Sequence, residues 1–278
     1  MSGEVSSTVA SRRPCTISVV SHRQGPLVER LLGDLAALPA DWIAKVVLTR
    51  NLPDDPIHVP SSLPFPLDLV ENGQPRGFGA NHNAAFARCD TPWFAVLNPD
   101  LRLSGDPFAA LLAAAQAETA LLSPKVLEPD GRTADSARLL PTPSRLARRV
   151  LARLGAKPGS RGHAEPRESR AEWFAGMFML LRSDALRAVG GFDERFHMYC
   201  EDVDLCARLR LAGWGIRQVD TTSVVHDARR ASRRSARHLG WHLASLCRLW
   251  ASRTFWRYRA LLASERRAEP SAHPMAGS

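Results

Sequence analysis

The chain has 278 residues, with 45% hydrophobic and 23% charged residues, which is ordinary for a globular protein and fits one large α/β domain with a small appendage or two modest domains. Its longest apolar runs are too short to cross a bilayer, and its N-terminal residues lack an apolar core of export-signal length, so neither a membrane-spanning nor an exported protein is expected. The five cysteines are scattered without a CxxC pair, which favours reduced thiols in a cytoplasmic protein.

The first elements predict a parallel β-α-β unit. A β-rich apolar run at 16–21, leucines at helical spacing in 27–38 and a second apolar run at 45–49 follow one another. Ligands in such units bind at the carboxyl ends of the strands, so Ser21 and Asn51 are candidate binding residues.

A proline-rich connector at 52–66 leads to a short strand at 67–70 and then to a glycine-rich turn. The turn Gly77–Gly79 opens a helix expected at about 80–88, and backbone N–H groups at a helix start can face a diphosphate. A tight turn that merely needs glycine is the alternative, because GxG without a third spaced glycine is a weak signal.

Residues 93–97 are strongly apolar and predict the centre of the sheet. They run directly into Asn98-Pro99-Asp100. A carboxylate at the carboxyl end of a central strand is well placed to hold a divalent cation. Pro-Asp as ordinary turn chemistry is the alternative.

The middle of the chain predicts a helix at 106–117 and a strand at 121–126. Residues 132–170 are basic and rich in Ser, Pro and Gly, with a short helix near 144–154, and we interpret them as a mobile cover without chemistry. Residues 173–182 predict one long strand that contains a glycine, which indicates close approach by a ligand or another backbone.

The stretch 190–206 begins as a glycine turn, passes through an aromatic run and delivers Glu201, Asp202 and Asp204 to a helix expected at 202–211. Acidic residues in a first helical turn often only cap free N–H groups and complement the helix dipole. Two adjacent carboxylates at a chain reversal also suit a general base.

Two more strands are expected at 214–219 and 223–226, the second ending at His226. A lone histidine after a strand is usually structural. Imidazole is also a metal ligand, better suited to Mn²⁺ than to Mg²⁺.

The C-terminal part carries the net charge of +9. Residues 229–267 contain eleven arginines and one glutamate, a balance of +10, so the rest of the chain is near −1. Tryptophans and leucines alternate with these arginines in a helical composition. An amphipathic helix on an anionic membrane and a helix packed on the domain are both open; nucleic-acid binding is not expected, because no recognition fold accompanies the arginines.

Four segments together resemble the inverting glycosyltransferases of family 2, which have the GT-A fold, and above all their rhamnosyltransferase-like branch. The segment GGFDERFHMYCEDVDLCARLRLAGW is similar to the branch's GGFDExFFxYxEDxDLxxR pattern, with His197 in place of a phenylalanine. The segment 72–83 is similar to the family's GFG signature, NPD stands in place of its DxD metal motif, and 173–182 resembles the strand before its catalytic turn. The resemblance covers about residues 15–228.

The resemblance implies roles for specific residues. It implies that Asp202 is the catalytic base and that Glu201 lies in the acceptor site, where Trp173 would wall the sugar unless it is a core residue. A Mn²⁺ or Mg²⁺ ion would be held by Asp100 and His226. Asn98 stands at the position of the first acid of the DxD motif and would belong to the donor-binding residues. The donor nucleotide-sugar would be lined by Ser21, Asn51, Asn72, Gly77, Phe78, Gly79 and Asn83.

One departure concerns the nucleotide base. Relatives usually have an Asp-Asn pair after the second strand, whereas this chain has Arg50-Asn51. Asp54 and Asp55 are the available substitutes.

The expected architecture is a disordered leader (1–14), a single Rossmann-like α/β domain with a mixed, mostly parallel sheet (15–228) and a basic helical tail (229–278). Within the domain, 15–100 would bind the nucleotide-sugar and 101–228 the acceptor. The expected enzyme is an inverting, metal-dependent glycosyltransferase. It would move a sugar, first of all rhamnose, from a dTDP- or UDP-sugar to a saccharide or lipid-linked acceptor in cell-surface polysaccharide assembly.

The expected location is the cytoplasm, with peripheral contact to the inner face of the cytoplasmic membrane. A catalytically silent protein tethered through its tail is the first alternative, favoured by Arg50 and Asn98 in place of acids. A nucleotidyltransferase on a similar sheet is a weaker one, because Ser21–Gly25 is a poor match to its glycine-rich loop.

Overall fold

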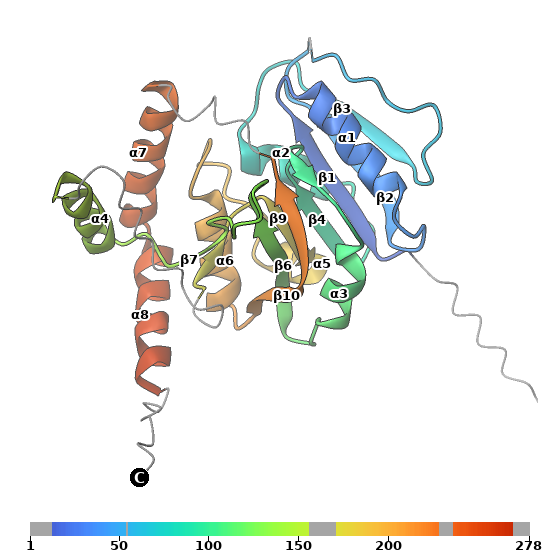
Figure 1. Ribbon diagram of the computed structural model, residues 1–278. Coiled ribbons are helices and arrows are strands. Elements are labelled where there is room, and N and C mark those ends of the chain that lie inside the picture. Colours follow the sequence, from blue (N-terminus) through green and yellow to red (C-terminus); the bar gives the residue numbers. More distant parts are fainter. Residues whose placement is uncertain (1–12, 54, 156–170, 228–235, 269–278) are drawn as a thin grey trace, which may run out of the picture.

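A computed structural model describes residues 13–53, 55–155, 171–227 and 236–268 (Figure 1). The N-terminal leader up to residue 12, part of the segment expected to be a cover (156–170), the start of the tail (228–235) and its end (269–278) lie outside the described residues. The strands are β1 (Cys15–Ser21), β2 (Ile43–Arg50), β3 (Leu67–Glu71), β4 (Trp93–Leu97), β5 (Leu101–Arg102), β6 (Thr119–Leu127), β7 (Ala137–Arg138), β8 (Trp173–Phe174), β9 (Phe178–Arg182) and β10 (Gly215–His226). The helices are α1 (Gly25–Ala36), α2 (Phe78–Phe86), α3 (Pro107–Ala113), α4 (Pro143–Gly155), α5 (Ser183–Ala188), α6 (Glu201–Leu211), α7 (Ala236–Ala251) and α8 (Arg253–Ala268).

The central sheet has eight strands in the order β3-β2-β1-β4-β9-β6-β10-β5. Strands β3, β2, β1 and β4 are parallel to one another, β9 is antiparallel to both of its neighbours, β6 and β10 are parallel, and β5 is antiparallel to β10. The mixed, mostly parallel sheet expected from the sequence is therefore confirmed.

The continuous apolar runs form strands because both faces of the sheet are covered. Along β9, Phe178 and Leu180 pack on one face, whereas Met179 and Leu181 pack on the other. This alternation is what a two-residue period requires of a strand buried on both sides.

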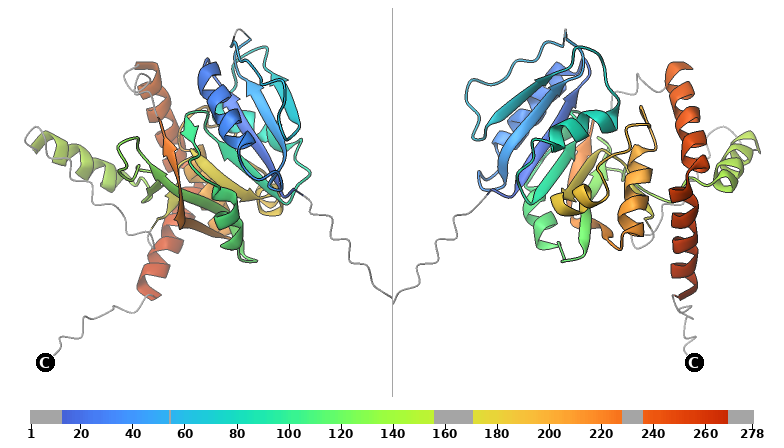
Figure 2. Two further views of the ribbon diagram at one scale, coloured as in Figure 1. Left: turned by 45° about the vertical axis from the view of Figure 1, so that its right-hand side comes forward. Right: turned by 180° about the vertical axis from the view of Figure 1, so that it is seen from behind.

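Each face has its own helices. Helices α1 and α3 cover one face through Val28, Leu31 and Phe108. Helices α2, α5 and α6 cover the other, and α8 lies outside α6 with Tyr258 in the same core (Figures 1 and 2).

The prediction of a single strand over 173–182 is wrong. Trp173 and Phe174 form β8, which pairs with β7 in a separate two-stranded sheet, and β9 begins only at Phe178. A tight turn separates the two strands, closed by the Met177 N–H donating to the Ala175 carbonyl over 2.7 Å. The glycine is closely approached, but by a side chain and not by the ligand or backbone that was expected, since a Cβ on Gly176 would lie 2.8 Å from Cζ of Phe78.

Part of the segment 132–170, expected to be a mobile cover with one short helix, is built into the domain. β7 pairs Arg138 with Trp173, and α4 follows at the expected place. The apolar residue Leu140 joins the core, which explains why this part is ordered.

Two boundaries differ from expectation for local reasons. The helix expected to reach residue 117 ends at Ala113, because the Thr119 hydroxyl accepts the Gln116 N–H and holds the chain in a turn. The two strands expected after α6 form one, β10, with a register irregularity between Val219 and Ser223.

The C-terminal helices α7 and α8 run end to end along one side of the domain (Figure 1). Ser252 separates them: its hydroxyl donates to the Leu249 carbonyl and accepts the Phe255 N–H. Buried Phe255, Tyr258 and Leu262 fix α8 to the domain. Packing on the domain, one of the two alternatives for the tail, is thus what the structure shows for α8. In the described part of the chain no helix is long and apolar enough to cross a membrane.

Candidate active site

The turn before α6 places two carboxylates at the start of that helix. Tyr199 and Cys200 both have positive φ (73° and 67°), so the chain reverses sharply just before Glu201. Cys200 occupies the N-cap position without a side-chain cap. The Asp202 carboxylate instead accepts two backbone N–H groups, from Gly176 to Oδ2 at 3.1 Å and from Val203 to Oδ1 at 2.9 Å.

The two carboxylates are electrostatically unequal. Burial, and then the charge of Asp202, raise the pKa of Glu201 to about 8 against the smaller effect of the backbone N–H groups of Glu201 and Tyr199, which favours the protonated form of Glu201. Burial also raises the pKa of Asp202, but the N–H groups of Gly176 and Val203 act against it. Two adjacent buried carboxylates cannot both ionise cheaply. Asp202 is the one equipped to carry the negative charge, as a general base requires.

A second pair stands at the end of the central strand. Asp100 Oδ2 lies 3.2 Å from Nε2 of His226, and the Asp227 N–H donates to the Asp100 carbonyl over 2.8 Å. Asp100 Oδ1 is buried without a hydrogen-bond partner among the described residues. An orphaned carboxylate oxygen beside an imidazole nitrogen fits a divalent cation. Within the described ranges no group of three or more His, Cys, Asp or Glu side chains could hold a metal, so this pair would need other ligands, such as phosphate oxygens.

The turn Ala175–Met177 joins the two pairs. The Asn98 N–H donates to the Met177 carbonyl over 2.9 Å, and the neighbouring Gly176 N–H reaches Asp202. These three residues therefore lie between the NPD segment (98–100) and the turn at 190–202 that carries the predicted catalytic residues, here called the catalytic turn. Through this turn the structure links Asn98 to Asp202, and it pairs Asp100 with His226. The chemical roles of these residues and of Glu201 stay predictions.

The GFG segment packs against the catalytic turn. A Cβ on Gly77 would lie 2.5 Å from the His197 carbonyl oxygen, and one on Gly79 would lie 2.8 Å from Cβ of Phe192. The Phe78 N–H donates to that same His197 carbonyl over 3.0 Å. The glycines are therefore required for contact between the predicted donor segment and the predicted acceptor turn.

Three of the predicted donor-binding asparagines hold protein groups. Asn51 Oδ1 accepts the Arg76 N–H and an Asn72 amide hydrogen, each over 2.8 Å, and a second Asn72 bond reaches Asn81. Asn83 accepts the Phe192 N–H and donates to the Phe192 carbonyl, both at 2.8 Å. These side chains position the two segments, and direct donor contact by them stays a prediction. Asn81 was not predicted; its spacing two residues before Asn83 carries no distinguishing signal.

Asp55 lies at the carboxyl end of β1, beside Ser21. The Ser21 hydroxyl and the Arg23 N–H both donate to Asp55 Oδ2. Asp55 is buried, and its Oδ1 has no hydrogen-bond partner among the described residues. Arg50, by contrast, pairs with Glu71. An acidic group therefore stands beside Ser21 although the usual position after the second strand is occupied by arginine.

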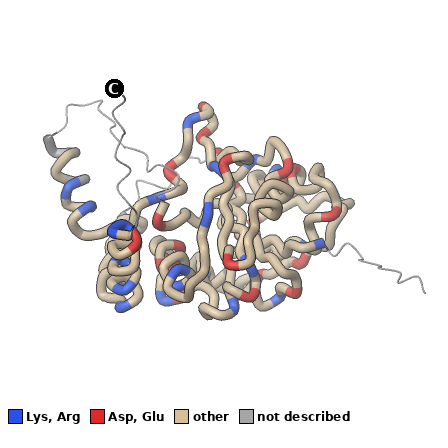
Figure 3. Tube along the Cα trace, turned by 90° about the horizontal axis from the view of Figure 1, so that it is seen from below, with Lys and Arg blue, Asp and Glu red and all other residues tan. Residues whose placement is uncertain are grey.

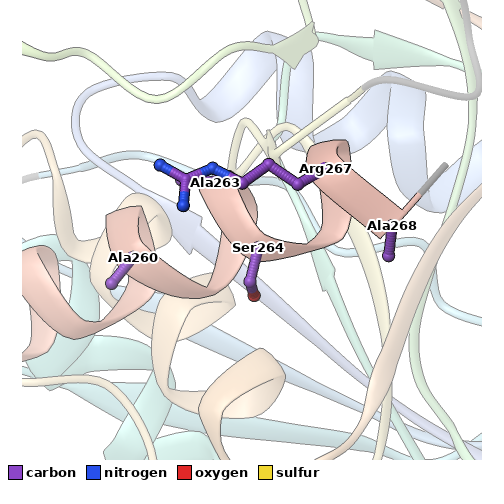
Figure 4. Close-up of a pocket in the computed structure, with 5 residues that line it drawn as sticks. All are labelled: Ala260, Ala263, Ser264, Arg267 and Ala268. Carbon is purple, nitrogen blue, oxygen red and sulfur yellow. The ribbon is translucent and has the colours of Figure 1, made fainter. Parts of the chain in front are cut away.

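Trp173 is a core residue by placement. It is buried, its indole N–H donates to the Leu139 carbonyl over 3.0 Å, and the Arg138 guanidinium lies 5.2 Å from its ring centre. That Trp173 contacts the acceptor sugar stays a prediction. A shallow hollow elsewhere is lined by residues of α8 alone, namely Ala260, Ala263, Ser264, Arg267 and Ala268 (Figure 4), and it adds no chemical group to the site.

Known sequences of similar length match most of the chain, although no protein-family model matches it. The N-acetylglucosaminyl-diphospho-decaprenol L-rhamnosyltransferase of Mycobacterium tuberculosis (strain H37Rv) is 32% identical over 269 residues, covering 88% of this chain and 87% of the relative. The rhamnosyltransferase WbbL of Escherichia coli (strain K12) is 30% identical over 251 residues, covering 84% and 92%.

Solved structures of glycosyltransferases share the fold. The mannosyltransferase PcManGT of Pyrobaculum calidifontis, solved with GDP-Man and Mn²⁺, has a TM-score of 0.54 at 17% identity over 93% of this chain and 76% of its own. GalNAc-T7, solved with UDP, GalNAc and Mn²⁺, has a TM-score of 0.58 at 13% identity over 92% of this chain and 51% of its own. The chain therefore belongs to the rhamnosyltransferase-like glycosyltransferases of family 2 and is a glycosyltransferase with the GT-A fold.

Proposed function

We propose that the protein transfers rhamnose from a nucleoside-diphosphate donor, dTDP-rhamnose, to a saccharide carried on a polyprenyl diphosphate, with inversion at the anomeric carbon. The names of the two sequence relatives support rhamnose as the sugar, and the mycobacterial name supports the acceptor class. The observation that carries the proposal is the turn Ala175–Met177, which accepts the Asn98 N–H on one side and donates the Gly176 N–H to Asp202 on the other.

In the proposed reaction Asp202 accepts the proton of the acceptor hydroxyl as that oxygen attacks the anomeric carbon. The bond from this carbon to the donor diphosphate breaks, and the diphosphate leaves on the opposite face. Glu201, protonated at neutral pH, leaves Asp202 as the charged member of the pair and can donate a hydrogen bond to the acceptor. One base suffices for a single displacement, so no covalent sugar–enzyme intermediate is required.

The donor would lie over the carboxyl ends of β1 and β4. We assign Asp55, held by Ser21, to the base or ribose of the nucleotide in place of the usual acid, because its free Oδ1 is an unsatisfied acceptor. Gly77, Phe78 and Gly79 would bring the start of α2 close to the sugar diphosphate. Asp100 and His226 would hold Mn²⁺ or Mg²⁺, which when bound neutralises charge on the departing diphosphate.

We further propose that the C-terminal helices rest on an anionic membrane from the cytoplasmic side. Leu239 and Leu243 lie one turn apart on α7 and are 60% and 53% exposed, and Leu151 on α4 is 66% exposed. Neither α4 nor α7 contains an aspartate or glutamate, and Figure 3 shows mostly blue positions on the C-terminal helices, whereas both signs mix over the sheet domain. Apolar side chains among arginines suit an anionic lipid surface, which is where a lipid-linked acceptor would be found.

The test is a transfer assay with dTDP-rhamnose, UDP-sugars and a short-chain polyprenyl-diphosphate N-acetylglucosamine, with Mn²⁺ or with a chelator. The proposal expects Mn²⁺-dependent transfer of rhamnose and, by NMR, an anomeric configuration opposite to that of the donor. An Asp100→Ala variant should lose at least about 10²-fold in rate. Donor hydrolysis and transfer both absent under all conditions would contradict the proposal and favour the catalytically silent alternative.

A further inference from the structure

Helix α7 closes one side of the catalytic turn. The Tyr199 hydroxyl lies 2.9 Å from Nδ1 of His238, and the Tyr199 ring centre lies 5.0 Å from that of His242. The Ser245 hydroxyl donates to the Met198 carbonyl over 2.8 Å. The residues that precede Glu201 and Asp202 therefore touch three successive turns of α7.

A cationic side chain lies on the same side from the small sheet. Arg138 on β7 stacks on Trp173 and is close enough to Asp202 for its charge to act against the rise that burial causes in the pKa of that residue. Burial lowers the pKa of His242, and the charge of Arg138 lowers it further, so Arg138 lies near both. Asp135 contacts the Nε group of Arg138. Within the described residues, the two Nη groups of Arg138 then remain available to bind a ligand.

Three nitrogen-bearing side chains thus lie beside the turn that carries Asp202. Tyr199 holds His238 through Nδ1. In the part of the chain that the structure describes, Nε2 of His238 then remains available to bind a ligand. His242 is exposed. The catalytic chemistry proposed above uses none of Arg138, His238 or His242. A guanidinium and two imidazoles suit a phosphate group, for which charge-assisted hydrogen bonds are strong.

We propose that Arg138, His238 and His242 form the binding site for the diphosphate of the lipid-linked acceptor. The inference rests on the proposed function, since a glycosyl acceptor at Asp202 would extend along this wall toward α7. The diphosphate is the group that distinguishes a polyprenyl-diphosphate sugar from a neutral glycoside, so a site for it would select the acceptor class. Leu239 and Leu243 of the same helix are exposed, and the lipid chain of the acceptor would lie along them.

The test measures acceptor affinity by calorimetry, separately from transfer. The probes are a short-chain polyprenyl-diphosphate N-acetylglucosamine and a glycoside with the same sugar and chain but no phosphate. Wild type should bind the diphosphate probe at least about tenfold more tightly. Arg138→Gln and His242→Gln should each remove most of this preference, whereas Arg248→Gln, which changes an exposed arginine of the same helix, should keep it.

Equal affinity of the wild type for the two probes would overturn the inference, and so would a preference that survives in both variants. An unchanged nucleotide-induced thermal shift in the variants would show that they are folded. Failure of the proposed function is seen separately, as absent rhamnose transfer by a wild type that still distinguishes the two probes.

Discussion

The two adjacent carboxylates of Glu201 and Asp202 have different surroundings, and this difference supports the proposal that Asp202 is the base. Asp202 accepts N–H groups from Gly176 and Val203. Backbone N–H groups of Glu201 and Tyr199 also favour the charged form of Glu201, but its Oε2 is buried without a hydrogen-bond partner among the described residues, and the charge of Asp202 acts against its ionisation. Hydrogen bonds to a carboxylate favour its ionised form, and burial without them favours the protonated form. The division of roles therefore follows from local contacts that no sequence motif specifies.

The protonation of Glu201 predicts how stability depends on pH. Its pKa is raised from 4.5 to about 8, by burial and then by Asp202. Between these values the folded state keeps a proton that the unfolded state releases, so stability present below about pH 4.5 is lost as pH rises through about 8. Glu201→Gln cannot ionise and should escape this loss. Between pH 5 and pH 8, the free energy of unfolding in urea should rise for the variant relative to wild type by at least about 1 kcal/mol. The same pH dependence of this free energy in both proteins would contradict the prediction.

At single residues, sequence motifs located the central groups but not their partners. Asp100, Asp202 and His226 could be predicted because family motifs fix their positions along the chain. Arg138 and His242 could not, because they reach the site through the pairing of β7 with β8 and the packing of α7. Such contacts depend on tertiary structure.

Most strands and helices were predictable, because hydrophobic period and turn residues specify them. The exceptions have physical causes. The run 173–182 is apolar throughout, as a buried strand should be, yet a tight turn at Gly176 splits it between two sheets. The short β7 has no pattern of its own and is defined only by its partner β8.

The contact between the GFG segment and the catalytic turn predicts a difference between two glycines. Gly77→Ala would place a Cβ 2.5 Å from the His197 carbonyl oxygen, whereas a Cβ on Gly73 would meet nothing within 4 Å. Gly77→Ala should therefore lower the free energy of unfolding by about 1–3 kcal/mol. Gly73→Ala should stay within about 0.5 kcal/mol of wild type. Equal stability of the two variants in urea unfolding would show that the packing of Gly77 is not required.

For the molecule as a whole, the C-terminal helices predict membrane binding that depends on charge. The protein should sediment with vesicles that contain phosphatidylglycerol and much less with vesicles of phosphatidylcholine alone. Replacing both Leu239 and Leu243 by serine should weaken binding at least about tenfold, since each buried leucine contributes roughly 1.5–3 kcal/mol. Leu69→Ser, which changes a 41% exposed leucine on β3, is the control. Equal sedimentation of all three proteins, or none with anionic vesicles, would argue against the membrane surface.

The central claim is that Asp202 is the general base of glycosyl transfer. The most direct test is the turnover number of Asp202→Asn with saturating dTDP-rhamnose and acceptor, compared with Asp220→Asn, which changes an exposed aspartate of β10. General base catalysis contributes about 10²–10⁴-fold, so Asp202→Asn should lose at least about 10²-fold in turnover while its nucleotide-induced thermal shift remains. Asp220→Asn should turn over like wild type. An Asp202→Asn enzyme that keeps most of its turnover would contradict the assignment.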